Sequence, residues 1–205
     1  MTLHQPVLHL ASSSPRRRDI LTAMGVSFSH AGVDIDETPA PAEAVADMVQ
    51  RVTRAKALAA YHSGNFTLPI LAADTVVALG DRILGKPAAK EQALEMLACL
   101  SGQAHQVLTA VALLVAGQLR TALSVTLVTF RKIGPDEALA YWQSGEPQGK
   151  AGAYAIQGRG GIFVASLSGS YSGVVGLPVF ETALLLQAAN IDVLPQQIIG
   201  NAGRT

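Results

Sequence analysis

Runs of apolar residues, some continuous and some alternating with polar ones, divide the chain into strands and helices. Residues 69–79 are apolar at nearly every position, which is typical of a strand buried on both faces. Two further apolar and β-branched runs, 107–116 and 119–130, are joined by Gly117-Gln118. Because a Gly-X pair suits a two-residue type II′ turn, these runs predict a long antiparallel hairpin. Shorter strands are expected at 7–11, 26–31 and 83–84.

Apolar residues recur at helical spacing in several other segments. The spacing predicts a helix over 43–62. Its core stripe is formed by four small or branched residues, Val45, Val49, Val52 and Ala59. Lys56 falls on the same stripe, so its ammonium group must either extend past the core to water or meet an anion. Other helices are expected to begin at Pro15 and to cover 91–100, 134–142 and 178–190.

Glycine is dense between 146 and 178, where it permits positive φ and close approach of the backbone to a ligand. The glycine spacing there does not fit the dinucleotide-binding fingerprint. Gly85-Lys86-Pro87 is not a P-loop, but the proline holds Lys86 in an extended conformation. The strands and helices together predict an α/β fold with a loop-rich C-terminal part.

Composition narrows the class of protein. The 205 residues are 49% hydrophobic and 15% charged, with a formal net charge of zero. A neutral chain exerts no general attraction on nucleic acid or an anionic membrane, and no apolar run approaches the ~20 residues of a membrane span. A single cysteine, Cys99, excludes an internal disulfide and favours a reducing cytoplasm. The excess of apolar over charged residues is compatible with self-association.

The segment Ser12 to Arg18 carries the first candidate chemistry. Ser14 is a good N-cap and Pro15 a good first helical residue, so three arginines occupy the first turn of a helix. Cations there are disfavoured by ~0.3–1 kcal/mol each, unless an anion rests on the free N–H groups. We interpret the segment as a phosphate site. The alternative is a solvated arginine-rich turn that Asp19 partly compensates.

One buried acidic residue and one acidic loop are candidates for cation binding or catalysis. Asp74 stands in the middle of the apolar strand, where a lone ionised carboxylate costs several kcal/mol unless it is paired, hydrogen-bonded or metal-bound. A purely structural role, accepting backbone N–H groups, is the alternative. The loop containing Asp34, Asp36 and Glu37 suits a hard cation such as magnesium, or is a solvated turn. The five histidines lack metal-ligand spacing, so a zinc site is not expected.

Seven motifs, in order, resemble those of the Maf family of nucleoside triphosphate pyrophosphatases, and they span residues 8–190. They are Leu10-Ala11-Ser12-x-Ser14-Pro15-Arg16-Arg17, Asp36-Glu37, Lys56-Ala57, Ala73-Asp74-Thr75-Val76-Val77, Gly85-Lys86-Pro87, Lys150-Ala151-Gly152-Ala153-Tyr154 with Gln157-Gly158, and Val175-Gly176-Leu177-Pro178. The resemblance implies one domain over 1–205, with an elongated mixed sheet, flanking helices and two lobes around a central cleft. It implies hydrolysis between the α- and β-phosphates to a monophosphate and pyrophosphate, a divalent cation and, often, a homodimer.

The resemblance also assigns roles to residues. The triphosphate-binding set would be Arg16, Lys56 and Lys86, with Arg17 in support and the hydroxyls of Ser12 and Ser14 completing the cradle. Asp74 and Glu37 would hold Mg²⁺ or Mn²⁺, and Asp74 would orient or deprotonate the attacking water.

Substrate preference is indicated by three positions that resemble the family's selectivity residues, Arg16, Thr75 and Gln157. The pair Thr75 and Gln157 is similar to the dTTP/UTP branch, whereas the 7-methyl-GTP branch carries glutamine and glutamate there. A neutral amide suits uracil or thymine because it can accept from N3–H and donate to a carbonyl. Two alternatives stay open: a 7-methyl-GTP pyrophosphatase, and a non-catalytic nucleotide-binding regulator of septum formation.

Overall fold

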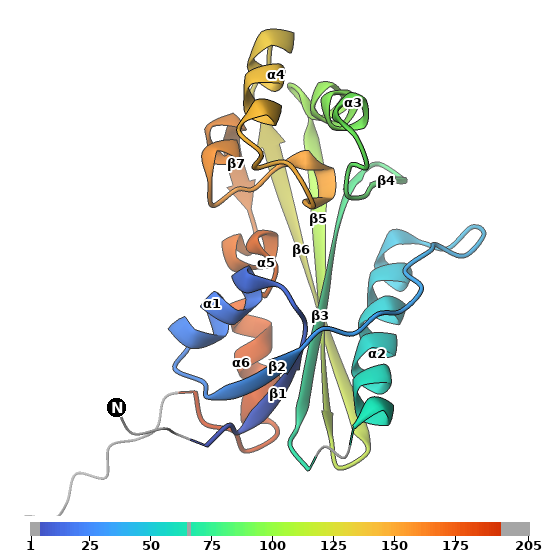
Figure 1. The fold of residues 1–205 in the computed structure, drawn as a ribbon, viewed down its shortest axis with the longest axis vertical. Helices are drawn as coiled ribbons and strands as arrows, with labels where there is room; N and C mark the ends of the chain where they lie inside the picture. Colours follow the sequence, from blue (N-terminus) through green and yellow to red (C-terminus); the bar gives the residue numbers. More distant parts are fainter. Residues whose placement is uncertain (1–4, 65–66, 194–205) are drawn as a thin grey trace, which may run out of the picture.

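A mixed sheet forms the centre of the computed structural model, which describes residues 5–64 and 67–193. Within these residues the sheet has seven strands in the order β2-β1-β3-β5-β6-β7, and β4 pairs with the far end of β3 (Figure 1). The strands are β1 (Leu8–Ala11), β2 (Phe28–Ala31), β3 (Ile70–Leu79), β4 (Arg82–Leu84), β5 (Ala104–Val115), β6 (Gln118–Phe130) and β7 (Val164–Ser168). The predicted α/β class with an elongated mixed sheet is confirmed.

Helices cover both faces of this sheet. They are α1 (Pro15–Ala23), α2 (Val45–Ser63), α3 (Lys90–Leu100), α4 (Pro135–Gln143), α5 (Tyr171–Val175) and α6 (Val179–Gln187), with short 3₁₀ turns η1 (Ala151–Ala153) and η2 (Arg159–Phe163). Figure 1 shows α2 on one side of β3 and α1, α5 and α6 on the other, while α3 and α4 lie at the far end. In the described part of the chain, no helix combines the length and the apolar character needed to cross a bilayer.

Strand β3 is buried on both faces, as its continuous apolar run predicts. Ile70 and Ala72 pack with Ala57 of α2, whereas Leu71 and Ala73 pack with the side of the sheet that carries α1 and α6. Side chains of a strand alternate between faces, so Asp74 follows the α2 side and Thr75 the opposite side.

Two long strands connect separate parts of the core. Near α3 and α4, an upper cluster contains Leu84, Leu97, Phe130, Tyr154 and Phe163. The other clusters lie at the opposite end of the sheet, against α1, α2 and α6. The hairpin of β5 and β6 runs through both ends, because its pairing extends from Ala104–Thr129 to Val115–Gln118.

The hairpin is confirmed, but the predicted turn is wrong. The loop residues are Ala116 and Gly117, with φ of 48° and 78°, whereas Gln118 already pairs with Val115. Positive φ at both central residues is the pattern of a type I′ turn, whose twist matches that of the flanking strands. The sequence favoured Gly117-Gln118 because an alanine seldom adopts positive φ.

The glycine-rich segment is more regular than its composition suggests, since it contains η1, η2, β7 and α5. The core stripe of α2 is also shifted from the predicted one. Its buried side chains are Met48, Val49, Val52, Thr53, Lys56, Ala57 and Ala60, while Val45 and Ala59 are only partly buried.

Candidate active site

A gap in strand pairing along β3 creates the site. On this edge β1 pairs with β3 only at Ile70 and Leu71, and β4 pairs with it only from Val77 to Leu79. Between these two contacts the edge of β3 has no strand partner among the described residues. Asp74 and Thr75 lie in this gap, so their side chains, although on opposite faces, both reach the same cavity.

The cavity has a volume of about 660 Å³ and separates the upper cluster from the rest of the core. Its wall includes all ten residues expected to form a site: Ser12, Ser14, Arg16, Arg17, Glu37, Lys56, Asp74, Thr75, Lys86 and Gln157. They come from the β1–α1 turn, the first turn of α1, the loop after β2, α2, β3, the loop after β4 and the segment after η1. The structure therefore brings these residues together, and their individual roles stay predictions.

Lys56 forms the charged centre of the wall. Its Nζ lies 2.5 Å from Glu37 Oε1 and 2.6 Å from Asp74 Oδ1. Both residues line the cavity, although Lys56 is only 8% and Asp74 only 7% exposed. The ion pair shows that the buried carboxylate of Asp74 is paired rather than alone. Burial raises the pKa of Glu37, but the hydrogen bond and charge of Lys56, with weaker effects of Lys86 and Arg17, lower it overall. Glu37 is therefore ionised at neutral pH.

The same carboxylates suit a divalent cation whose coordination shell is completed by phosphate oxygens of a substrate. Glu37 and Asp74 lie close together, since an oxygen of each contacts Lys56 Nζ between them. A cation would bind to carboxylate oxygens beside the ammonium group, because Nζ itself occupies the point between the two acids. Magnesium is commonly held by one or two carboxylates plus substrate phosphates. Among the described residues, no group of three or more His, Cys, Asp or Glu side chains is placed to enclose a metal. The donor set therefore suits magnesium or manganese shared with a nucleotide.

The first turn of α1 lies at the cavity as predicted, with Ser14 as N-cap residue and Pro15 as the first helical residue. The Ser14 side chain makes no capping hydrogen bond. Ser12 Oγ instead accepts from the Ser14 backbone N at 3.2 Å and from Arg17 NH1 at 3.2 Å.

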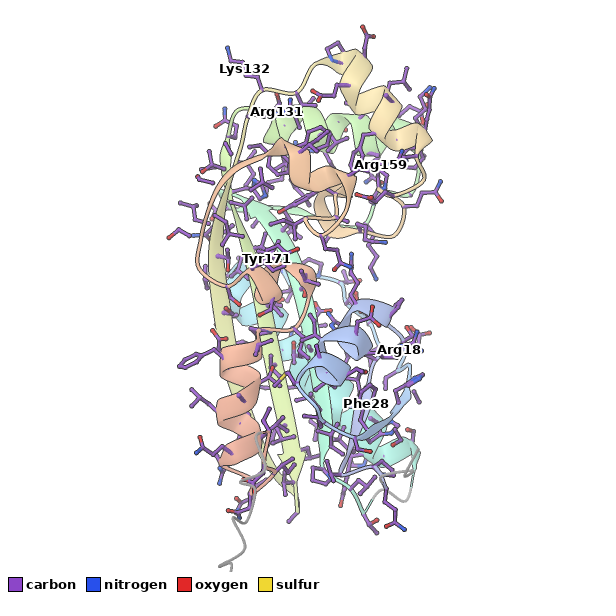
Figure 2. The ribbon with its side chains drawn as sticks, turned by 90° about the vertical axis from the view of Figure 1, so that its left-hand side faces the viewer. Arg18, Phe28, Arg131, Lys132, Arg159 and Tyr171 are labelled. Atoms are coloured by element: carbon purple, nitrogen blue, oxygen red, sulfur yellow. The ribbon has the colours of Figure 1, made fainter. Side chains whose placement is uncertain are left out.

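The three arginines of this turn point in different directions. Arg16 lines the cavity, where burial lowers the pKa of its guanidinium. Arg17 is fixed by protein acceptors: its Nε donates to the Gly176 carbonyl at 2.9 Å, and NH2 lies 3.4 Å from Thr75 Oγ1. Arg18 lies on the outer side of α1, 3.1 Å from His30 Nε2 (Figure 2). Only Arg16 and Arg17 therefore line the cavity.

Comparison with known proteins agrees with this arrangement. The family model described as "Maf-like protein" matches residues 7–189. The chain belongs to the Maf family. A protein of Nitrosomonas europaea named dTTP/UTP pyrophosphatase is 50% identical over 198 residues, covering 91% of this chain and 96% of that protein. One of Methylococcus capsulatus with the same name is 51% identical over 180 residues, covering 88% and 89%.

Among solved structures, a nucleoside-triphosphatase, dITP/XTP pyrophosphatase, from Mycobacterium abscessus aligns with 60% of this chain and 72% of that chain. The TM-score is 0.39 and the sequence identity 16%. A likeness at this level carries no argument about the site.

Two residues of one Maf motif, to which the sequence assigned no role, also line the cavity of this Maf family member. Lys150 lines it, and burial, with the nearby charge of Arg16, lowers the pKa of the lysine. A lysine beside glycines looks like an ordinary loop residue, so only the motif itself could have indicated it. Tyr154 also lines the cavity, and its hydroxyl lies 2.9 Å from His105 Nε2.

Buried His105 is expected to make the stability of this Maf fold depend on pH. Its side chain packs edge-on against Phe130 with ring centroids 4.8 Å apart, and Nδ1 has no hydrogen-bond partner in the described structure. Burial lowers the pKa of His105 from 6.5 to about 4. Between these values the unfolded chain binds a proton that the folded chain does not, so stability falls as pH falls through this window.

We expect this histidine to remove about 3 kcal/mol from the free energy of unfolding between pH 7 and pH 4. Urea denaturation across that range measures the effect. A His105→Gln variant, less stable at pH 7, should lack this part of the pH dependence. Equal pH slopes in the wild type and the variant would contradict the assignment.

Proposed function

We propose that the chain is a nucleoside triphosphate pyrophosphatase that hydrolyses dTTP and UTP to the monophosphate and pyrophosphate. One observation carries this proposal: a single cavity is lined by five cationic and three acidic side chains. The cations are Arg16, Arg17, Lys56, Lys86 and Lys150, and the acids are Asp34, Glu37 and Asp74. A polyphosphate bound with a divalent cation matches both sets of charges. The relatives named dTTP/UTP pyrophosphatase, at 50% and 51% identity, support the choice of substrate.

Binding of the triphosphate falls to the basic side chains and the start of α1. Arg16, Lys86 and Lys150 neutralise phosphate oxygens from different sides of the cavity. The free N–H groups at the N-terminus of α1 add donors that favour an anion. Ser12 Oγ accepts from Ser14 N and Arg17, so its own hydrogen is available to a phosphate oxygen.

Cleavage is a displacement in which water attacks phosphorus and the bond to the α–β bridging oxygen breaks. Asp74 takes a proton from the water, and pyrophosphate leaves with the electron pair of the broken bond. Lys56, beside Asp74, orients the carboxylate and offsets charge that develops on the phosphate oxygens. Glu37 and Asp74 would hold magnesium or manganese, which supplies charge neutralisation and orients the phosphates.

The activity itself is tested by incubating the full chain with dTTP and magnesium and separating the products. We expect dTMP and pyrophosphate in equal amounts. Binding of dTTP without product would instead support a nucleotide-binding regulator of septum formation. Parallel incubations with UTP and 7-methyl-GTP distinguish the two substrate branches.

Gln157 is proposed to read the base edge together with Thr75 and Arg16. Gln157→Glu replaces a donor and acceptor with an acceptor-only carboxylate, which cannot donate to a thymine carbonyl. We expect kcat/KM for dTTP and UTP to fall about five- to tenfold more than for 7-methyl-GTP, since one lost hydrogen bond is worth ~1–1.5 kcal/mol. Gln148→Glu, on an exposed residue outside the cavity wall, is the charge-matched control. An unchanged preference ratio would remove Gln157 from selectivity.

We also propose the domain organisation, compartment, metal and oligomeric state that the sequence predicts. The chain acts as one domain of two lobes in the cytoplasm, uses magnesium or manganese, and forms a homodimer. It binds neither nucleic acid nor a membrane, because a chain with no net charge exerts no general electrostatic attraction on either.

A further inference from the structure

Glu146, in the loop after α4, carries a carboxylate that the mechanism above does not use. It lies outside the cavity wall, so it does not contact a nucleotide bound there. Three donors nevertheless converge on it. Its Oε1 accepts from the Tyr141 hydroxyl at 2.7 Å and from Gly160 N at 2.9 Å, and its Oε2 accepts from Arg159 N at 2.9 Å. The carboxylate is therefore committed to holding protein groups rather than a ligand.

The segment that Glu146 holds presents Gln157 to the cavity. Gly158 N donates to the Ala155 carbonyl at 3.1 Å, which closes a four-residue turn with Gln157 at its third position. Gln157 lines the cavity. The two N–H groups bonded to Glu146 follow directly after this turn, beginning at Arg159 (Figure 2). The Gln157 side chain makes no hydrogen bond within the part of the chain that the structure describes, so its position depends on the backbone of the turn.

Tyr141, near the end of α4, holds the beginning of the same turn. Its hydroxyl donates its one hydrogen to Glu146 and accepts from Ala155 N at 3.0 Å, so donors and acceptors match. Its ring, 5% exposed, packs edge-on against Phe163 with centroids 5.0 Å apart. Glu146 is fixed in turn, because its backbone N donates to Ser144 Oγ at 3.3 Å. Two anchored side chains therefore hold the turn at its first residue and just after its last.

A carboxylate suits this arrangement better than an amide of the same size. Its two oxygens accept all three hydrogen bonds and carry no hydrogen. An amide at position 146 would place its NH2 group against the N–H of either Arg159 or Gly160, so one backbone donor would lose its acceptor. A Cβ at Gly158 would overlap Glu146 Oε2, so the carboxylate packs directly against the turn. Burial raises the pKa of Glu146, but its hydrogen bonds, that from Gly160 first, lower it overall.

We propose that Glu146 and Tyr141 are positioning residues that hold the turn 155–158 so that the Gln157 amide meets the base of the bound nucleotide. This inference rests on the proposed function for the identity of the ligand and the role of Gln157. The competing explanation is that Glu146 only stabilises the fold, or acts on phosphates through Lys150 in its own loop. The explanations differ in one respect: only positioning requires Gln157 to be present.

The test measures pyrophosphate release from UTP by Glu146→Gln and by Tyr141→Phe. Displacing the Gln157 amide costs about one hydrogen bond to the base, so KM should rise about three- to tenfold in each variant. A contact to the base is the same in the ground state and the transition state, so kcat should stay within about twofold. In a Gln157→Ala background, neither substitution should change KM by more than about twofold, because the residues act as one unit.

Glu137→Gln is the matched control. Glu137 lies on α4 and outside the cavity wall, its side chain is 36% exposed, and it pairs with Arg131 at 2.5 Å. The substitution removes the same charge from the same part of the fold, so KM should stay within about twofold. Thermal unfolding checks that each variant is folded at the assay temperature. If Glu146→Gln does not fold, Tyr141→Phe still tests the turn.

Each outcome of the series decides the proposal. A rise in KM that disappears in the Gln157→Ala background supports it. An unchanged KM in a folded variant, an equal rise in Glu137→Gln, or a rise that persists without Gln157 would overturn it and leave the proposed function in place. If the wild type releases no pyrophosphate, the proposed function fails, and dissociation constants for α,β-imido-UTP test the positioning role. Absence of binding by the wild type would overturn both.

Discussion

Asp74→Asn should lower kcat for dTTP by about 10²–10⁴-fold, the range expected on losing a general base. The amide keeps the size of the side chain, and Lys56 retains Glu37 as a counter-ion at 2.5 Å. Fold and nucleotide binding should therefore persist, with KM within a few-fold of the wild type. Pyrophosphate release gives kcat, and thermal unfolding checks that the fold is intact.

Asp36→Asn is the matched control for this loss. Asp36 lies in the same loop as Glu37, but it is exposed and does not line the cavity. Its Oδ1 accepts a hydrogen bond from the backbone N of Thr38 at 2.9 Å. Its removal should leave turnover unchanged. Near-normal pyrophosphate release by Asp74→Asn would exclude Asp74 as the base and leave it only a binding role.

Lys56→Met should both abolish turnover and destabilise the fold. It removes the ammonium group that pairs with Asp74, whose side chain is 9% exposed, and with Glu37, which is 44% exposed. Removing one partner of a buried pair costs about 3–5 kcal/mol, and the exposure of Glu37 places this case near the lower figure. Urea unfolding at pH 7 measures the loss.

A double variant separates charge from packing in this prediction. Lys56→Met with Asp74→Asn leaves no unpaired buried carboxylate, so most of the lost stability should return while turnover stays absent. Arg54→Met, on the exposed side of α2, should change the free energy of unfolding by no more than ~0.5 kcal/mol. If the double variant is as unstable as Lys56→Met, the destabilisation comes from packing and not from the stranded charge.

The sequence predicted the position of the site better than the direction of its side chains. Consecutive residues on a helix are about 100° apart, so Arg16, Arg17 and Arg18 cannot all face one ligand. Their order in sequence does not say which of them face the cavity, because that depends on where α1 packs. The structure supplies this: Arg17 reaches Thr75 and Gly176, and Arg18 reaches His30.

Lys56 and Thr109 show the two limits of sequence reasoning. Helical spacing placed Lys56 on the core side, but its partners, Glu37 and Asp74, come from segments 19 and 18 residues away in opposite directions. No local pattern encodes that meeting. Thr109 was missed for another reason: in a β-branched run, threonine is expected as a strand former. Its position opposite Thr75 in the β3–β5 register, which no local pattern encodes, places it beside a residue of the cavity wall.

The hairpin of β5 and β6 has a mechanical consequence for the cavity. Strands of 12 and 13 residues run through both ends of the molecule, so the connection that they form contains no loop that could serve as a hinge. Narrowing of the cavity around a nucleotide must therefore deform the sheet itself, by a change in its twist. The stiffness of β5 and β6, rather than the length of a connecting loop, then limits how far the cavity can widen when the product leaves.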